Sequence, residues 1–103
     1  MRTRILLLLV LLLAAPLGAA TYPGKLTIDA TARSLTYGTN RHCRGRLETA
    51  SVRLRYDGTA PTATEGELIE PGDIVTISGA DLANAQFIRT GGTSGVLPYH
   101  CWR

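Results

Sequence analysis

Short runs in which apolar and polar residues alternate, separated by turn-forming residues, constrain the fold of this chain most strongly. Residues 25–30 (KLTIDA) and 51–56 (SVRLRY) show the period of two that is typical of half-buried strands. In the second run, Arg53 and Arg55 fall on the outer surface, and three apolar side chains are expected to face the core: Val52, Leu54 and Tyr56.

Turn residues end the second run and open the next one. Asp57 and Gly58 terminate the strand. Pro71 and Gly72 suit the central positions of a type II turn, because proline fixes the first backbone conformation and glycine adopts the positive φ of the second. This turn predicts a further strand over residues 74–77.

The C-terminal third contains one helical signal and one hairpin signal. Residues 81–86 are the only segment expected to form a short helical turn, with Asp81 able to cap it. Apolar runs at 87–90 and 96–101 flank the glycine-rich segment 91–95, a pattern that predicts a β-hairpin.

These segments together predict an all-β fold of six or seven short strands. The expected architecture is a small antiparallel β-sandwich or barrel, jelly-roll-like, with at most one short helical turn near residues 81–86. A domain of this size buries a limited core, so a covalent crosslink or a partner subunit is expected to add stability.

The N-terminus has the three parts of a cleavable secretory signal. Arg2 and Arg4 precede the apolar run 5–15, and small residues follow it up to Ala20. The run is shorter than the roughly 20 residues of a membrane span, although an uncleaved anchor remains the alternative. We therefore expect residues 1–20 to be removed, residues 21–103 to form one β domain, and the protein to be exported: periplasmic, secreted or virion-associated.

Cys43 and Cys101 are the only cysteines in the chain. An even pair in an exported protein predicts a disulfide. The neighbouring His42 and His100 raise the alternative of a two-Cys, two-His zinc site. Adjacent residues of a strand point to opposite faces, and oxidation removes the thiolates, so no metal is expected.

Charge is nearly balanced once the signal is removed. Without Arg2 and Arg4, nine basic residues remain against eight acidic ones, a net charge of +1, so no nucleic-acid partner is expected, nor a membrane after signal cleavage.

The charges are segregated, however, and a candidate interaction face comprises Arg41, Arg44, Arg46, Arg53 and Arg55. An acidic stretch follows: Glu65, Glu67, Glu70 and Asp73. These stretches are interpreted as solvated faces that attract each other within or between subunits, with glycan or nucleic-acid binding as the alternative.

No segment carries a catalytic signature. The glycine-rich segment 91–95 lacks the lysine and the following helix of a phosphate-binding loop. No Gly-x-Ser-x-Gly elbow is present, and the carboxylates near residues 65–73 lie in a turn-rich segment. The sequence thus predicts a non-enzymatic protein without a cofactor.

Residues 52–62 carry an Arg-x-Arg-x-Asp-Gly-x-x-Pro-Thr motif, in which the turn consists of Asp57, Gly58, Pro61 and Thr62. With Gly66, the strand that opens after residues 71–73, and the strand at 87–89, this motif resembles a group of small β-rich accessory proteins of tailed bacteriophages and prophages. The resemblance implies a virion-associated or structural β-sandwich protein with no catalytic residues. The export signal and the cysteine pair are features that this group commonly lacks, so this chain would be a secreted variant.

Two functional hypotheses follow. The first is a non-enzymatic structural or interaction module of phage or prophage origin, associated with the virion and binding protein through self-association or virion components. The second is a secreted or periplasmic bacterial binding domain that presents its arginines to an anionic glycan or an acidic protein.

Overall fold

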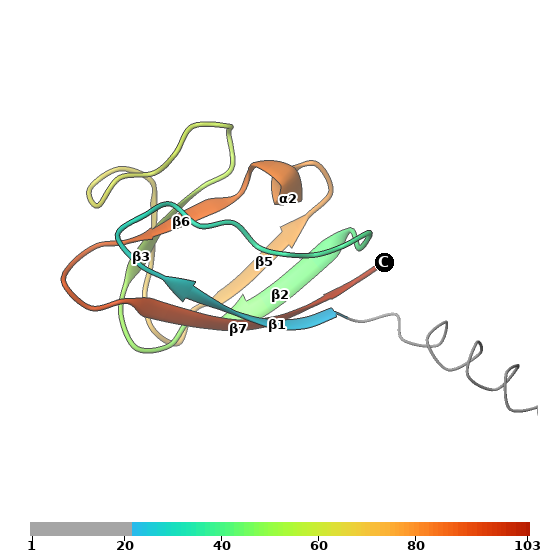
Figure 1. Ribbon diagram of the computed structural model, residues 1–103, viewed down its shortest axis with the longest axis horizontal. Helices are drawn as coiled ribbons and strands as arrows, with labels where there is room; N and C mark the ends of the chain where they lie inside the picture. The colour runs from blue at the N-terminus through green and yellow to red at the C-terminus, as the bar shows by residue number, and fades with distance from the viewer. Residues whose placement is uncertain (1–21) are drawn as a thin grey trace, which may run out of the picture.

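The computed structural model describes residues 22–103, so the predicted signal at residues 1–20 and its cleavage point lie outside the described part. Seven strands and one short helix make up this part (Figure 1). In chain order they are β1 (Tyr22–Ile28), β2 (His42–Arg46), β3 (Val52–Arg55), β4 (Glu67–Ile69), β5 (Ile74–Ser78), α2 (Asp81–Asn84), β6 (Gln86–Arg89) and β7 (Gly95–Trp102).

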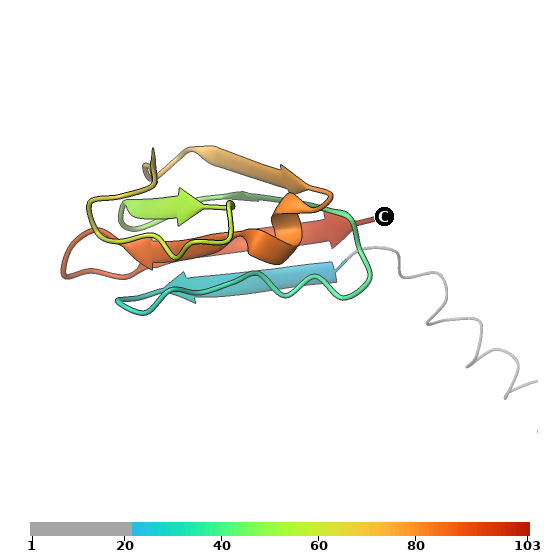
Figure 2. The same ribbon diagram turned by 90° about the horizontal axis from the view of Figure 1, so that it is seen from above.

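The strands form two antiparallel sheets. The four-stranded sheet has the order β1-β7-β2-β5, and the three-stranded sheet has the order β4-β3-β6. Figures 1 and 2 show the two sheets from directions 90° apart. The all-β class is confirmed, and the choice between a sandwich and a barrel stays a prediction.

Buried and exposed residues alternate along the strands of both sheets, and the buried residues form one hydrophobic core. On β7, for example, Leu97, Tyr99 and Cys101 are buried, whereas the residues between them are partly or fully exposed. Val52 and Leu54 of β3 are buried as expected, but Tyr56 is 44% exposed. The expectation for Tyr56 is wrong because β3 ends at Arg55, and the alternation ends with the strand.

The predicted hairpin between the last two strands is also wrong. β6 pairs with β3, and β7 pairs with β1 and β2, so the glycine-rich segment carries the chain from one sheet to the other. β7 begins at Gly95, where a methyl group would lie 2.6 Å from a Val52 side-chain carbon. The small residue is required there because the crossing brings the two sheets into close contact.

The turn before β5 has the predicted form. The N–H of Asp73 donates to the Glu70 carbonyl oxygen at 2.9 Å, and Gly72 has a φ of +96°. The short helix α2 is also present. Its cap, however, is Ala80 without a side-chain hydrogen bond, and Asp81 is the first helical residue, so the predicted capping role of Asp81 is wrong.

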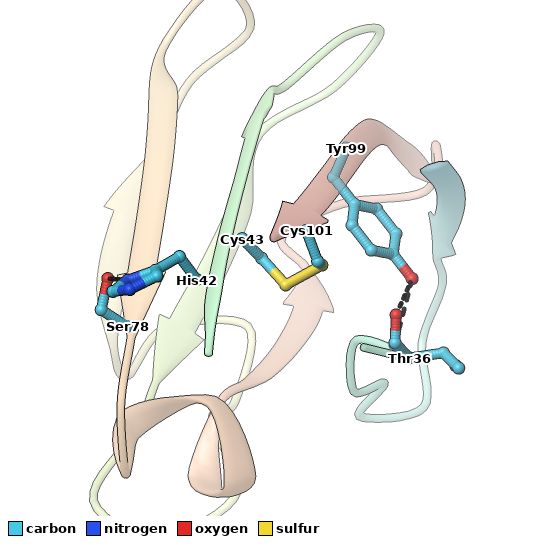
Figure 3. Close-up of a disulfide and its surroundings, with 6 residues drawn as sticks. All are labelled: Thr36, His42, Cys43, Ser78, Tyr99 and Cys101. Carbon is cyan, nitrogen blue, oxygen red and sulfur yellow. Dashed lines mark hydrogen bonds between the residues drawn. A yellow bond between two sulfur atoms is a disulfide. The ribbon is translucent and has the colours of Figure 1, made fainter. Parts of the chain in front are cut away.

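Tyr99 fastens the long connection between β1 and β2 to the core. Its hydroxyl accepts a hydrogen bond from the Thr36 N–H at 3.0 Å and donates one to the Thr36 carbonyl at 2.9 Å (Figure 3). A methyl group at Gly24 would lie 2.7 Å from the Tyr99 ring, so glycine on β1 leaves the space that this ring occupies. The connection also covers the edge of β6, because Arg33 and Phe87 exchange two backbone hydrogen bonds of 2.8 Å.

Candidate functional site

The predicted disulfide joins Cys43 of β2 to Cys101 of β7 (Figure 3). The two residues are directly opposed in the antiparallel ladder, their Cα atoms are 4.0 Å apart, and both are buried. His42 and His100 lie on the opposite side of the sheet from the sulfur atoms, as the alternation predicts. A buried disulfide is typical of proteins that fold in an oxidising compartment.

Within residues 22–103, no three His, Cys, Asp or Glu side chains come together in a way that could hold a metal ion. In the same range, no helix is long and apolar enough to cross a membrane.

Residues 53–66 show how the motif of residues 52–62 builds a loop. Arg55 Nε donates to Asp57 Oδ1 at 3.1 Å, and Arg55 Nη2 pairs with Asp57 Oδ2. The same Oδ1 atom accepts a hydrogen bond from the Thr59 N–H at 3.1 Å, and Gly58 has a φ of +89°. These hydrogen bonds lower the pKa of Asp57 to about 2, and the bond from Arg55 has a larger effect than the bond from Thr59.

The other motif residues close the same loop. Arg53 donates to the carbonyl oxygens of Ala63 at 3.4 Å and Gly66 at 3.2 Å. Thr62 Oγ1 accepts a hydrogen bond from the Glu65 N–H at 3.0 Å, and Pro61 is buried. The motif residues therefore shape the loop that leaves β3, which is a structural role.

The five arginines of the predicted interaction face do not form one face. Arg44 and Arg46 are exposed on β2, in the four-stranded sheet, and Arg41 precedes that strand. Arg53 and Arg55 are partly buried on β3, in the three-stranded sheet, where their guanidinium groups bind the following loop. The division arises because the chain changes sheets between β2 and β3.

A different group of residues gathers on the four-stranded sheet, on the side away from the core. His42 is opposite Trp102 in the ladder, and their rings stack with centroids 5.5 Å apart. The ring of His100 lies 5.4 Å from that of Trp102. The Nδ1 atom of His42 is 2.9 Å from the Ser78 hydroxyl oxygen, which links this group to β5 (Figure 3).

This side of the sheet, which we call the basic outer face, is defined by the outward positions of its four strands: Lys25 and Thr27; His42, Arg44 and Arg46; Ile74, Thr76 and Ser78; Val96, Pro98, His100 and Trp102. Three of these residues are positively charged and none is acidic. A shallow depression of about 410 Å³ on this face is lined by Arg44, Arg46 and His100, among others. The arrangement suits an anionic or acidic surface.

The clustering of Trp102 with the two histidines was not predicted, although the sequence contains its signal. If Cys43 and Cys101 are opposed on antiparallel strands, His42 must lie opposite Trp102, and Arg44 must lie opposite His100. Sequence reasoning predicted the disulfide but did not extend it to the register of its neighbours.

Comparisons of the chain with known proteins gave no match to a family model, to a curated protein or to a solved structure.

Proposed function

We propose that this chain is a non-enzymatic interaction module of phage or prophage origin, associated with the virion, which binds a protein partner through its basic outer face. The observation that carries the proposal is the grouping of Trp102, His42 and His100 beside Arg44 on an exposed sheet face without acidic residues. Tryptophan and arginine are enriched where proteins bind each other, because they bury large contact areas and donate directional hydrogen bonds.

The phage or prophage origin is supported by the motif of residues 52–62. Its members shape one loop through contacts among Arg53, Arg55, Asp57 and Thr62 and their neighbours. A motif whose residues build a loop fits a structural accessory protein. Export to the periplasm, the medium or the virion surface is supported by the buried disulfide, which requires an oxidising environment.

One contact resembles a catalytic pair, and the proposal of a non-enzymatic protein has to explain it. Ser78 and His42 are at hydrogen-bond distance, as a nucleophile and its base would be. Such a base needs a third group to orient it, and among residues 22–103 no carboxylate forms a hydrogen bond with His42. Stacking on Trp102 orients this imidazole as part of a surface instead.

A second candidate function is a secreted or periplasmic bacterial domain that binds an anionic glycan or an acidic protein. The depression between Arg44, Arg46 and His100 favours it, because guanidinium groups form paired hydrogen bonds with carboxylate and sulfate-like oxygens. Salt separates this candidate from the first. Binding to a polyanion weakens steeply as ionic strength rises, whereas a packed protein contact does not.

Mass spectrometry of purified phage particles, combined with light scattering of the purified domain, tests the first proposal. We expect the chain in the particles, and we expect Arg44→Ala with Arg46→Ala to reduce its incorporation. Arg33→Gln is the matched control, because Arg33 pairs with Asp29 outside the basic outer face. Absence of the chain from every particle and complex contradicts the virion assignment. Retention on a sulfated polymer that salt abolishes supports the second candidate.

A further inference from the structure

A groove between the two sheets has a free strand edge as one wall. It has a volume of about 360 Å³, and β5 lines it along its whole length. β5 pairs only with β2, and β4 pairs only with β3, so each strand ends its sheet on this side. In Figure 2, β5 (light orange) runs along the upper edge of the molecule. The opposite side differs, because the edge of β6 is covered by the segment around Arg33.

The backbone of β5 has hydrogen-bonding groups that face this groove. The Gly79 N–H donates to the Arg41 carbonyl at 2.8 Å, at the end of the ladder between β2 and β5. Hydrogen-bonded pairs alternate in an antiparallel ladder, so the N–H and C=O groups of three residues point away from β2: Ile74, Thr76 and Ser78. An edge of this kind is a template for another strand.

Side chains around this edge are suited to an extended, partly apolar segment. Among residues 24–103, three large hydrophobic residues are exposed, and two of them line the groove: Tyr56, which is 44% exposed, and Ile74, which is 48% exposed. Buried side chains form the floor, including Leu54 and Ile69. Every second residue of an added strand would point toward this floor.

The charges at the groove indicate which kind of segment can bind there. Its lining includes Glu67 and Asp81 and no basic residue. A second copy of the chain that added its own β5 edge across a two-fold axis would bring the same two carboxylates to the contact, where like charges repel. A segment that carries lysine or arginine is instead attracted.

We propose that this groove binds an extended peptide segment of a partner protein as an additional strand on β5, with apolar residues at every second position toward the floor and basic residues at the ends of the segment toward Glu67 and Asp81. Main-chain hydrogen bonds to Thr76 and its neighbours would supply affinity, and the apolar floor with its acidic rim would supply specificity. The groove and the basic outer face meet at β5, because Ile74, Thr76 and Ser78 belong to both. The proposal uses the main-chain groups of these residues and the carboxylates of Glu67 and Asp81, and it does not use the arginines of the basic outer face.

Amide hydrogen exchange of the disulfide-bonded domain, measured by NMR, tests the proposal with synthetic peptides. The probe is the heptapeptide KVKVKVK, and the controls are EVEVEVE and KVKPKVK, whose central proline cannot donate to a ladder. We expect KVKVKVK alone to slow exchange of the Thr76 amide, by about tenfold when about nine-tenths of the domain is bound. Unchanged exchange at Thr76, or equal binding of EVEVEVE, overturns the proposal.

Charge reversal provides a test within the domain. Glu67→Lys with Asp81→Lys is expected to weaken KVKVKVK binding by roughly threefold to tenfold, the range that two exposed ion pairs supply, and to improve binding of EVEVEVE. The matched control is Glu48→Lys with Glu70→Lys, which makes the same change in net charge outside the groove lining. Equal effects of both variants overturn the proposal, and so does a concentration-dependent dimer in sedimentation that protects Thr76 without peptide.

Discussion

Removing the disulfide is expected to destabilise the domain by about 4 kcal/mol. The bridge closes a loop with a sequence separation of 58 residues, and the entropy that such a closure removes from the unfolded chain corresponds to about 4 kcal/mol at 25 °C. Cys43→Ala with Cys101→Ala removes this restraint without burying a polar group. Serine at both positions would also bury two hydroxyl groups, because both sites are inaccessible to solvent, and each unpaired hydroxyl adds about 1 to 3 kcal/mol.

Urea denaturation of the oxidised parent and of the alanine double variant measures this effect. Trp102 is the only tryptophan of the chain and lies next to Cys101, so its fluorescence reports on the C-terminal strand. Circular dichroism reports on the sheets as a second probe. With a slope of about 1 to 1.5 kcal/mol per molar urea, the midpoint is expected to fall by roughly 3 to 4 M. Equal midpoints with equal slopes would refute the argument that the bridge stabilises by restricting the unfolded chain.

Three further outcomes are expected. Tyr99→Phe removes both hydrogen bonds to Thr36 and should lower the free energy of unfolding by about 1 to 2 kcal/mol, which urea denaturation measures. Gly24→Ala should cost about 1 to 3 kcal/mol in the same assay, because the new methyl group displaces the Tyr99 ring, and an unchanged midpoint would contradict this packing. Arg55→Gln should raise the pKa of Asp57 from about 2 toward 3.8 in an NMR titration. The folded-state pKa of Asp57 lies below that of the unfolded chain, so its stabilising contribution is present above about pH 4 and is lost as the pH falls toward 2, and this loss should be smaller in the variant.

The sequence predicts those strands whose buried positions are occupied by large apolar residues. β3 and β5 alternate clearly, with Val52 and Leu54 in one and Val75 and Ile77 in the other. β2 has no such pattern, because one of its inward positions is Gly45. A methyl group there would lie 2.9 Å from Tyr99 Cβ, so the Tyr99 side chain of β7 occupies the space that a larger β2 side chain would need. Such compensation across strands is not visible in a local pattern.

Sheet membership was not predictable from the turns. A glycine-rich segment suits a hairpin, in which the flanking strands pair, and equally a connection between sheets, in which they do not. The chain uses the second option between β6 and β7, and also between β4 and β5, although the turn around Gly72 has the predicted type. Local turn chemistry fixes the backbone of the turn, and tertiary packing decides where the following strand goes.

The disulfide connects the fold to the candidate site. A slip of one residue between β2 and β7 would move His42 and Arg44 to the buried side, because successive residues of a strand face opposite sides. The bond between Cys43 and Cys101 excludes that slip, since it holds these two residues directly opposite each other. It therefore fixes which residues reach the basic outer face, in addition to stabilising the domain. The binding surface that we propose therefore depends on the same strand register that the bridge between Cys43 and Cys101 holds in place.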